Sequence, residues 1–186
     1  MVETNAFTMC LDWKGDLWIS GWDCGIFHYS IEESCFKNYL TDRGRPILQG
    51  RIHTIKAFEP NKIYIGSDQG LTLFDPSTQK YITTSYNRNN SSSLSDDFVY
   101  DILKDNEGGL WITTYFGGIN YSNPNSSNFT IRHCATESAR GRIISKFHED
   151  KNGDIFIGTD DGGLFIYNPI KDKCHRYTIC LLYTSP

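Results

Sequence analysis

Short segments of β-branched and aromatic residues recur along this chain at a nearly constant spacing. They occupy residues 17–21, 63–67, 110–114 and 155–159, and their starts lie 46, 47 and 45 residues apart. A glycine follows each segment, at positions 25, 70, 118 and 163. Five such residues between turn residues are typical of a strand and too few for a helix. The pattern therefore predicts four copies of one unit built around this strand.

The residues on either side of this segment predict three more strands in each copy. Alternating apolar and polar residues indicate a strand before it, seen best at 99–104 and 143–148. An Asp-x-x-Gly turn joins the two strands in three copies and begins at Asp12, Asp105 and Asp150. A third strand follows the later glycine, as at 164–167, and a proline loop ends it. The fourth strand is predicted at 35–39, 80–83, 128–131 and 174–177.

Four short antiparallel strands in each of four repeats predict an all-β fold, a β-propeller. No stripe with a period of 3.6 residues supports helical repeats. The predicted blades are residues 1–46, 47–93, 94–139 and 140–178, and we expect them to be part of a larger propeller of the seven-bladed type. Residues 179–186 depart from the repeat and resemble the translation of a sequencing adapter, so we expect a non-native tail.

Composition and charge narrow the possible partners and cofactors. The chain of 186 residues is 39% hydrophobic and 14% aromatic, which is enough for a buried core. Its formal net charge of -4 is dispersed along the sequence, which argues against nucleic acid as a partner. No apolar run is long enough to span a bilayer, so membrane attachment is expected only through parts outside this sequence. The cysteines show no CxxC spacing and no common repeat position, so they indicate neither zinc nor a disulfide ladder.

The repeat resembles the two-component regulator propeller repeats, whose pattern is an Asp-x-x-Gly turn, then Leu-Trp-Ile-Gly-Thr, then Gly-Gly-Leu and an aromatic residue. Copy four matches the pattern most fully, through Asp150, Gly153, residues 155–159, residues 162–164 and Tyr167. Copy three has Thr113 in place of the glycine, and copy two lacks the Asp turn. The resemblance implies the periplasmic sensor region of a membrane-anchored hybrid histidine kinase that responds to glycan-derived oligosaccharides. It implies no catalysis in this segment.

Strand direction predicts where a ligand would bind. The turns after the second strands and the connections between copies should lie on one rim, where the copies differ most in sequence. Aromatic and acidic residues in these turns suit a sugar, and arginines in the connections could bond its hydroxyl or carboxylate groups. The candidate residues in the turns are Trp22, Asp23, Asp68, Gln69, Tyr115, Phe116, Asp160 and Asp161. Those in the connections are Arg43, Arg45, Arg51 and Arg88.

Other interpretations compete with this site. The rim residues could be ordinary turn residues, and the ring could serve protein docking or receptor dimerisation. Trp18 and Trp111 share their repeat position with other large aromatics, which indicates packing between blades. Residues 150–154 space oxygen atoms like the start of a calcium loop but lack the distal glutamate, so we expect a turn and no metal. No motif indicates a cofactor or a catalytic centre. A propeller lyase should place His or Arg at the start of the first strand in several blades.

Overall fold

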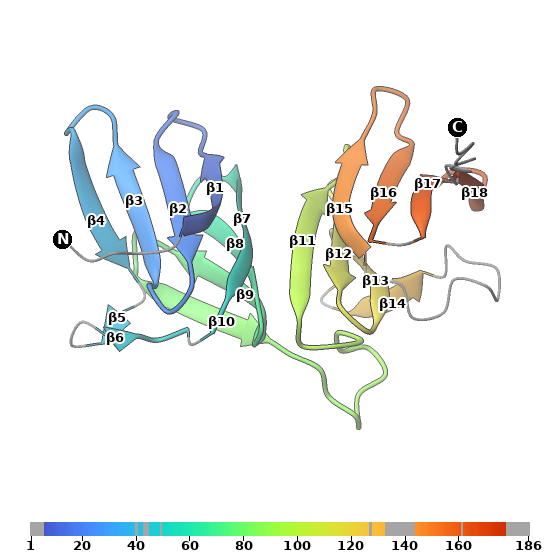
Figure 1. The fold of residues 1–186 in the computed structure, drawn as a ribbon, viewed down its shortest axis with the longest axis horizontal. Helices are drawn as coiled ribbons and strands as arrows, with labels where there is room; N and C mark the ends of the chain where they lie inside the picture. Colours follow the sequence, from blue (N-terminus) through green and yellow to red (C-terminus); the bar gives the residue numbers. More distant parts are fainter. Residues whose placement is uncertain are drawn as a thin grey trace, which may run out of the picture.

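The computed structural model describes residues 6–39, 41–42, 45–48, 50–126, 128–132, 144–160 and 162–177, with only the backbone at 42, 45 and 46. Within these ranges the chain forms four four-stranded antiparallel sheets and one short hairpin (Figure 1). The strands of each sheet fall within one of the intervals taken as blades, and the fold is a β-propeller. The expected non-native tail at 179–186 lies outside the described residues.

Strand bounds follow the repeat. Blade 1 consists of β1 (Ala6–Leu11), β2 (Leu17–Gly21), β3 (Ile26–Ser30) and β4 (Cys35–Tyr39). Blade 2 consists of β7 (Ile52–Glu59), β8 (Lys62–Ser67), β9 (Gly70–Asp75) and β10 (Lys80–Thr84). Blade 3 consists of β11 (Val99–Lys104), β12 (Leu110–Thr114), β13 (Gly118–Ser122) and β14 (Phe129–Arg132). Blade 4 consists of β15 (Ile144–Glu149), β16 (Ile155–Thr159), β17 (Gly163–Asn168) and β18 (Lys173–Tyr177). The hairpin in the first connection, β5 (Thr41–Asp42) and β6 (Arg45–Pro46), was not predicted.

The turn between the first two strands of each blade has the backbone that its residues predict. Gly15, Gly108 and Gly153 have φ values of 84°, 87° and 81°, in the left-handed region that glycine adopts without strain. Blade 2 lacks this glycine, and Asn61 takes the left-handed conformation with a φ of 58°. Asparagine tolerates this region better than most residues, so the divergent copy still closes its hairpin.

Hydrophobic cores lie between neighbouring blades. The first strands β1, β7, β11 and β15 contact one another in succession. Trp18 packs in one cluster with Ile55 of the next blade, and Trp111 packs with Phe147 in the same way. Both tryptophans are 2% exposed, which confirms the prediction of a packing role. Burial of a large apolar side chain contributes roughly 1.5 to 3 kcal/mol, so these contacts stabilise the blades against each other.

The glycine of the repeat motif marks a close approach between blades 2 and 3. A Cβ atom on Gly66 would lie 2.6 Å from the side chain of Val99 and 2.7 Å from that of Thr54. Blade 3 carries Thr113 at the same ladder position, opposite Asp101. The Thr113 hydroxyl accepts a hydrogen bond of 2.8 Å from the backbone N–H of Asp101. The departure from the motif therefore satisfies a buried donor.

The carboxylate of Asp101 connects three blades. Its side chain is 1% exposed. Oδ1 accepts a hydrogen bond of 3.0 Å from the Thr54 hydroxyl of blade 2 and lies 3.2 Å from the Lys56 ammonium. Oδ2 accepts a hydrogen bond of 3.1 Å from the backbone N–H of Phe147 in blade 4. A buried charge needs such partners to offset its desolvation, so Asp101 fixes the spacing of the inner strands.

The described cysteines do not form a repeated pattern. Cys10, Cys24 and Cys35 are free thiols, whereas Cys174 is disulfide-bonded. Burial raises the pKa of Cys10 to about 11, which keeps its thiol protonated and unreactive at neutral pH. Among the residues that the structure describes, none belongs to a helix of the length and apolar character needed to cross a bilayer.

Candidate functional site at the rim

The turns after the second strands meet the connections that lead into the first strands, either of the same blade or of the next one. The backbone N–H of Asp23 donates to the Gly50 carbonyl at 3.1 Å, and that of Asp68 donates to the Arg51 carbonyl at 3.1 Å. In blade 3, the N–H of Tyr115 donates to the Phe98 carbonyl at 2.9 Å. These bonds place both kinds of loop on one edge of the blades, which we call the rim.

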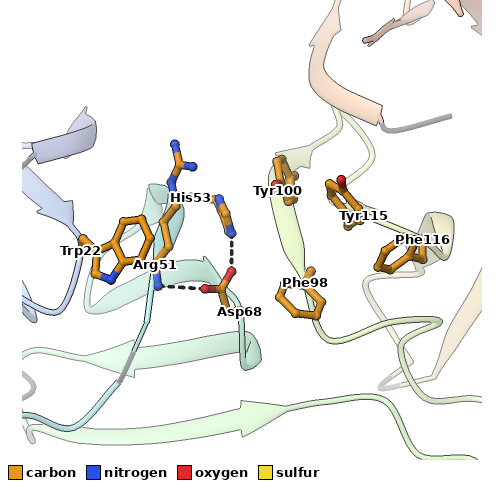
Figure 2. Close-up of a pocket in the computed structure, with 8 residues that line it drawn as sticks. All are labelled: Trp22, Arg51, His53, Asp68, Phe98, Tyr100, Tyr115 and Phe116. Carbon is orange, nitrogen blue, oxygen red and sulfur yellow. Dashed lines mark hydrogen bonds and ion pairs between the residues drawn. The ribbon is translucent and has the colours of Figure 1, made fainter. Parts of the chain in front are cut away.

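A pocket of about 360 Å³ opens on the rim beside blades 1, 2 and 3. Its lining residues are Trp22, Arg51, His53, Asp68, Phe98, Tyr100, Tyr115 and Phe116. Figure 2 shows Trp22, Arg51 and Asp68 on one side and Phe98, Tyr115 and Phe116 on the other. We call this cavity the rim pocket. Its volume lies at the lower end of the range typical of small-molecule sites.

A hydrogen-bonded unit from blade 2 supplies the polar wall of the rim pocket. The two oxygens of Asp68 have different partners: Oδ1 lies 2.6 Å from Nε2 of His53, and Oδ2 accepts a bond of 3.0 Å from the Arg51 N–H. Burial lowers the pKa of His53 below its ordinary value and outweighs the opposing effect of Asp68. His53 is therefore neutral at pH 7, and its Nε2–H donates to the carboxylate.

Aromatic rings form the remaining wall and are in contact with one another. The His53 ring stacks on Tyr100 with centroids 4.2 Å apart and planes 18° apart. Tyr100 contacts Tyr115 at 5.5 Å, and Tyr115 contacts Phe116 edge to face at 4.4 Å. The phenol of Tyr100 has a raised pKa, mainly because of burial, so its hydroxyl is available as a neutral hydrogen-bonding group.

A β-bulge in the first strand of every blade places one residue near the rim. The ladder skips one residue in each blade, between Ala6 and Thr8, Ile52 and Thr54, Val99 and Asp101, and Ile144 and Lys146. The skipped residues are Phe7, His53, Tyr100 and Ser145. Bulges re-aim side chains near functional sites, and two of these residues line the rim pocket. One of the four skipped residues is a histidine, and none is an arginine.

The structure brings some of the sequence-predicted rim residues together and leaves others apart. The predicted residues that line the rim pocket are Trp22, Arg51, Asp68, Tyr115 and Phe116. Asp23 instead accepts a bond of 2.6 Å from the N–H of Gly50, which lies in the connection to blade 2. The other predicted residues that are described but do not line the pocket are Gln69, Arg88 and Asp160. Arg45 lies in β6 with only its backbone described, and Arg43 and Asp161 lie outside the described residues.

Three lining residues were not among the predicted ones. Two of them, His53 and Tyr100, occupy the bulge, and Phe98 precedes β11. The sequence pairs Ile52 with His53 and Val99 with Tyr100 at equivalent strand starts, which was the available signal. In blade 4 the strand was expected from residue 143, which lies outside the described residues, and the described strand β15 spans Ile144–Glu149.

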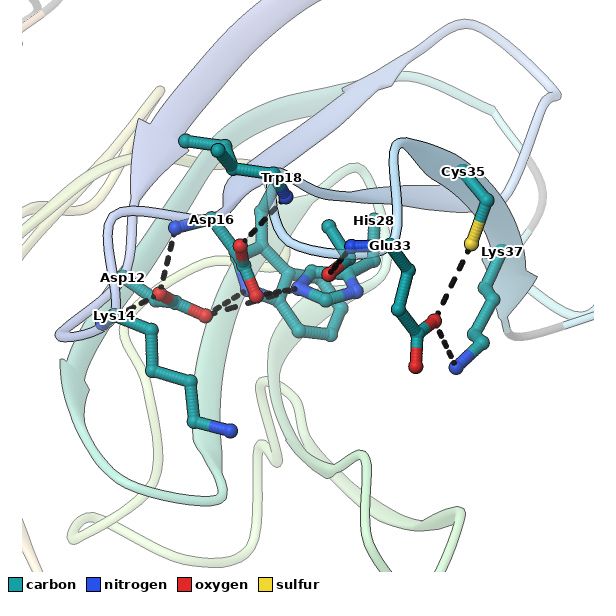
Figure 3. A network of polar contacts seen from close by, with 10 residues as sticks. Asp12, Lys14, Asp16, Trp18, His28, Glu33, Cys35 and Lys37 are labelled. Carbon is teal, nitrogen blue, oxygen red and sulfur yellow. Dashed lines mark hydrogen bonds and ion pairs between the residues drawn. The ribbon is translucent and has the colours of Figure 1, made fainter.

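A second polar cluster lies at the opposite turn of blade 1 (Figure 3). Asp12 accepts a bond of 3.0 Å from the Trp18 indole, and His28 Nε2 lies 3.8 Å from Asp12 and 3.5 Å from Asp16. These three side chains are close enough to hold a metal ion. However, Nδ1 of His28 is buried without a partner, whereas a metal-binding histidine normally donates its second N–H. We assign the cluster to turn and indole positioning.

Residues 150–154 form a turn of the same kind. Asp150 Oδ1 accepts bonds of 2.8 Å and 2.9 Å from the N–H groups of Asn152 and Asp154. In blade 3, Asp105 bonds the Trp111 indole at 2.8 Å, as Asp12 bonds Trp18. The geometry shared by these turns explains why the motif aspartate recurs: it closes the turn and, where the next strand carries a tryptophan, also satisfies its indole.

A family model described as two component regulator propeller matches residues 93–116, which contain β11 and β12. This stretch of the chain is thus similar to one copy of the two-component regulator propeller repeat. The matched span begins in the connection and includes Phe98, Tyr100 and Tyr115 of the rim pocket. Comparison with curated protein sequences finds no match.

Solved structures resemble this chain over nearly its whole length. The extracellular domain of the hybrid two component system BT3049 from B. thetaiotaomicron has a TM-score of 0.79 and 21% identity, over 96% of this chain and 25% of that chain. The extracellular domain of the hybrid two component system BT4673 from the same organism has a TM-score of 0.73 and 19% identity, over 93% of this chain and 25% of that chain. Virginiamycin B lyase from Staphylococcus aureus has a TM-score of 0.70 and 13% identity, over 97% of this chain and 58% of that chain. These likenesses show the fold, and the chain spans a quarter of the length of the first two structures.

Proposed function

We propose that this regulator propeller is the ligand-sensing segment of an extracytoplasmic receptor of the hybrid two-component type, and that the rim pocket binds a glycan-derived oligosaccharide. The signal would pass to a histidine kinase in the same receptor, on the other side of a membrane. Support comes from the two-component regulator repeat and from the likeness to extracellular domains of hybrid two component systems. Binding would act by favouring one arrangement of the receptor over another.

The observation that carries the proposal is the composition of the rim pocket. Five of its lining side chains are Trp, Phe or Tyr, and three are Arg, His or Asp. A sugar ring has an apolar C–H face, which suits a flat aromatic side chain, and hydroxyl groups, which suit polar partners. Trp22 and Phe116 are 55% and 77% exposed, so their faces are accessible to a ligand.

Calorimetric titration of the protein with a panel of oligosaccharides tests this function. Trp22→Ala and Tyr115→Ala should each weaken the binding of the active oligosaccharide by about tenfold or more, because each removes one aromatic wall. Tyr86→Ala is the matched control, since Tyr86 is 49% exposed and does not line the pocket. Equal affinity in all the variants would contradict binding at the rim pocket.

A further inference from the structure

The guanidinium of Arg51 has no anionic partner among the described residues. Its Cζ atom lies 4.3 Å from the centroid of the Phe7 ring, which holds the side chain at the rim pocket. Its Nε atom is buried and has no hydrogen-bond partner. None of the ion pairs within the described ranges includes Arg51. A buried, unsatisfied donor on a charged group is costly unless a ligand completes it.

The carboxylate of Asp68 is the nearest candidate partner, but it is already engaged. One oxygen bonds the His53 ring and the other accepts the backbone N–H of Arg51, so neither is directed at the guanidinium. Figure 2 shows the Arg51 side chain extending away from Asp68, with its guanidinium next to the His53 ring. Asp68 therefore positions the Arg51 backbone and the His53 ring, and leaves the cation available.

The aromatic wall limits what can carry the anion. The stacked pair of His53 and Tyr100 lies next to the guanidinium, and Tyr115 and Phe116 continue the wall across the pocket. Inorganic phosphate would use the cation but leave these ring faces bare. A ring with a carboxylate substituent uses both, because guanidinium and carboxylate form paired hydrogen bonds in one plane.

We propose that the ligand of the rim pocket is an acidic oligosaccharide, in which the carboxylate of a uronic acid residue pairs with Arg51 while a neighbouring sugar ring stacks on the aromatic wall. The proposal rests on the proposed function and names its ligand class. It assigns Arg51 the role of discriminating acidic from neutral sugars. The bulge residues His53 and Tyr100 form the part of the aromatic wall next to Arg51.

Calorimetric titration with oligogalacturonate and with a neutral galacto-oligosaccharide of equal length tests this assignment. The unsubstituted protein should bind the acidic oligomer about tenfold more tightly than the neutral one, and high salt should reduce that difference. Arg51→Met should abolish the preference, and Arg51→Lys should keep part of it, since lysine retains the charge without the fork. Arg132→Met is the matched control, because Arg132 also lies over an aromatic ring, 5.3 Å from the Tyr121 centroid, and lies outside the pocket.

The outcomes separate the two proposals. Equal affinity for both oligomers, or a preference that survives Arg51→Met, overturns the role of Arg51 while leaving sugar sensing intact. Absence of binding to every oligosaccharide overturns the proposed function and this assignment with it. Thermal unfolding of each variant, followed by circular dichroism, shows whether a loss of binding in Arg51→Met reflects a loss of structure. If it does, the preference that Arg51→Lys retains for the acidic oligomer decides the role of the charge.

Discussion

Replacing Asp101 tests whether one carboxylate holds three blades together. Asp101→Ala removes the acceptor of the Thr54 hydroxyl and of the Phe147 N–H. Each hydrogen bond to a charged group contributes roughly 1.5 to 3 kcal/mol. The Lys56 ion pair adds about 1 kcal/mol or less, because that ammonium is 33% exposed. We therefore expect Asp101→Ala to lower the free energy of unfolding by about 3 to 5 kcal/mol, a large share of the stability of a typical domain.

Urea unfolding followed by tryptophan fluorescence measures this loss. Asp101→Asn keeps the shape and one acceptor oxygen, so its cost should be smaller, about 1 to 2 kcal/mol, and it keeps the experiment informative if the alanine variant does not fold. Asp160→Ala is the control, since Asp160 is exposed and should change stability by about 0.5 kcal/mol or less. If Asp101→Ala behaved like this control, the reasoning that Asp101 connects the blades would be refuted.

Two further predictions concern backbone and pH. Gly70→Ala should lower the melting temperature far more than Gly118→Ala. A Cβ on Gly70 would lie 2.3 Å from the Thr84 carbonyl oxygen, whereas a Cβ on Gly118 would have open space. Similar melting temperatures for the two variants would contradict this steric argument. His53 has a lowered pKa in the folded state, so the unfolded chain takes up its proton first and stability should fall as pH drops below the ordinary value of 6.5. In urea titrations at about pH 7.5 and 5.5, His53→Gln should remove that part of the difference in the free energy of unfolding, even though Asp68 loses its imidazole partner. An unchanged difference between the two pH values would show that His53 does not contribute.

The repeat predicted the architecture because its signals are local. The strand at 110–114, the turn at Gly108 and the packing role of Trp111 depend on residues within a few positions of one another, and all three were confirmed. Prediction of the site was less complete, because its wall depends on the bulges that carry His53 and Tyr100. A bulge is defined by the register between two strands, and one strand's sequence does not contain that register.

The arginines show the same limit. Four arginines lie in the first two connections between blades, and nothing in their local sequence distinguishes Arg51 from the others. Arg51 lines the pocket because its backbone forms an isolated β-bridge with Trp22 of the preceding blade. That contact joins positions 29 residues apart in the sequence. Pairing at this distance follows from how the blades are placed side by side, which the repeat period predicts only in outline.

The contrast between Gly66 and Thr113 has a consequence for engineering. A consensus propeller built from identical units would place glycine at both positions. At Gly66 that choice suits the close neighbour Val99, but at Thr113 it would remove the hydroxyl that bonds the Asp101 N–H. Averaging the four units would therefore produce a blade with an unsatisfied backbone donor at Asp101, next to its buried carboxylate. A designed repeat should therefore keep both residues of such a pair together, since Thr113 lies opposite Asp101 in the adjacent strand.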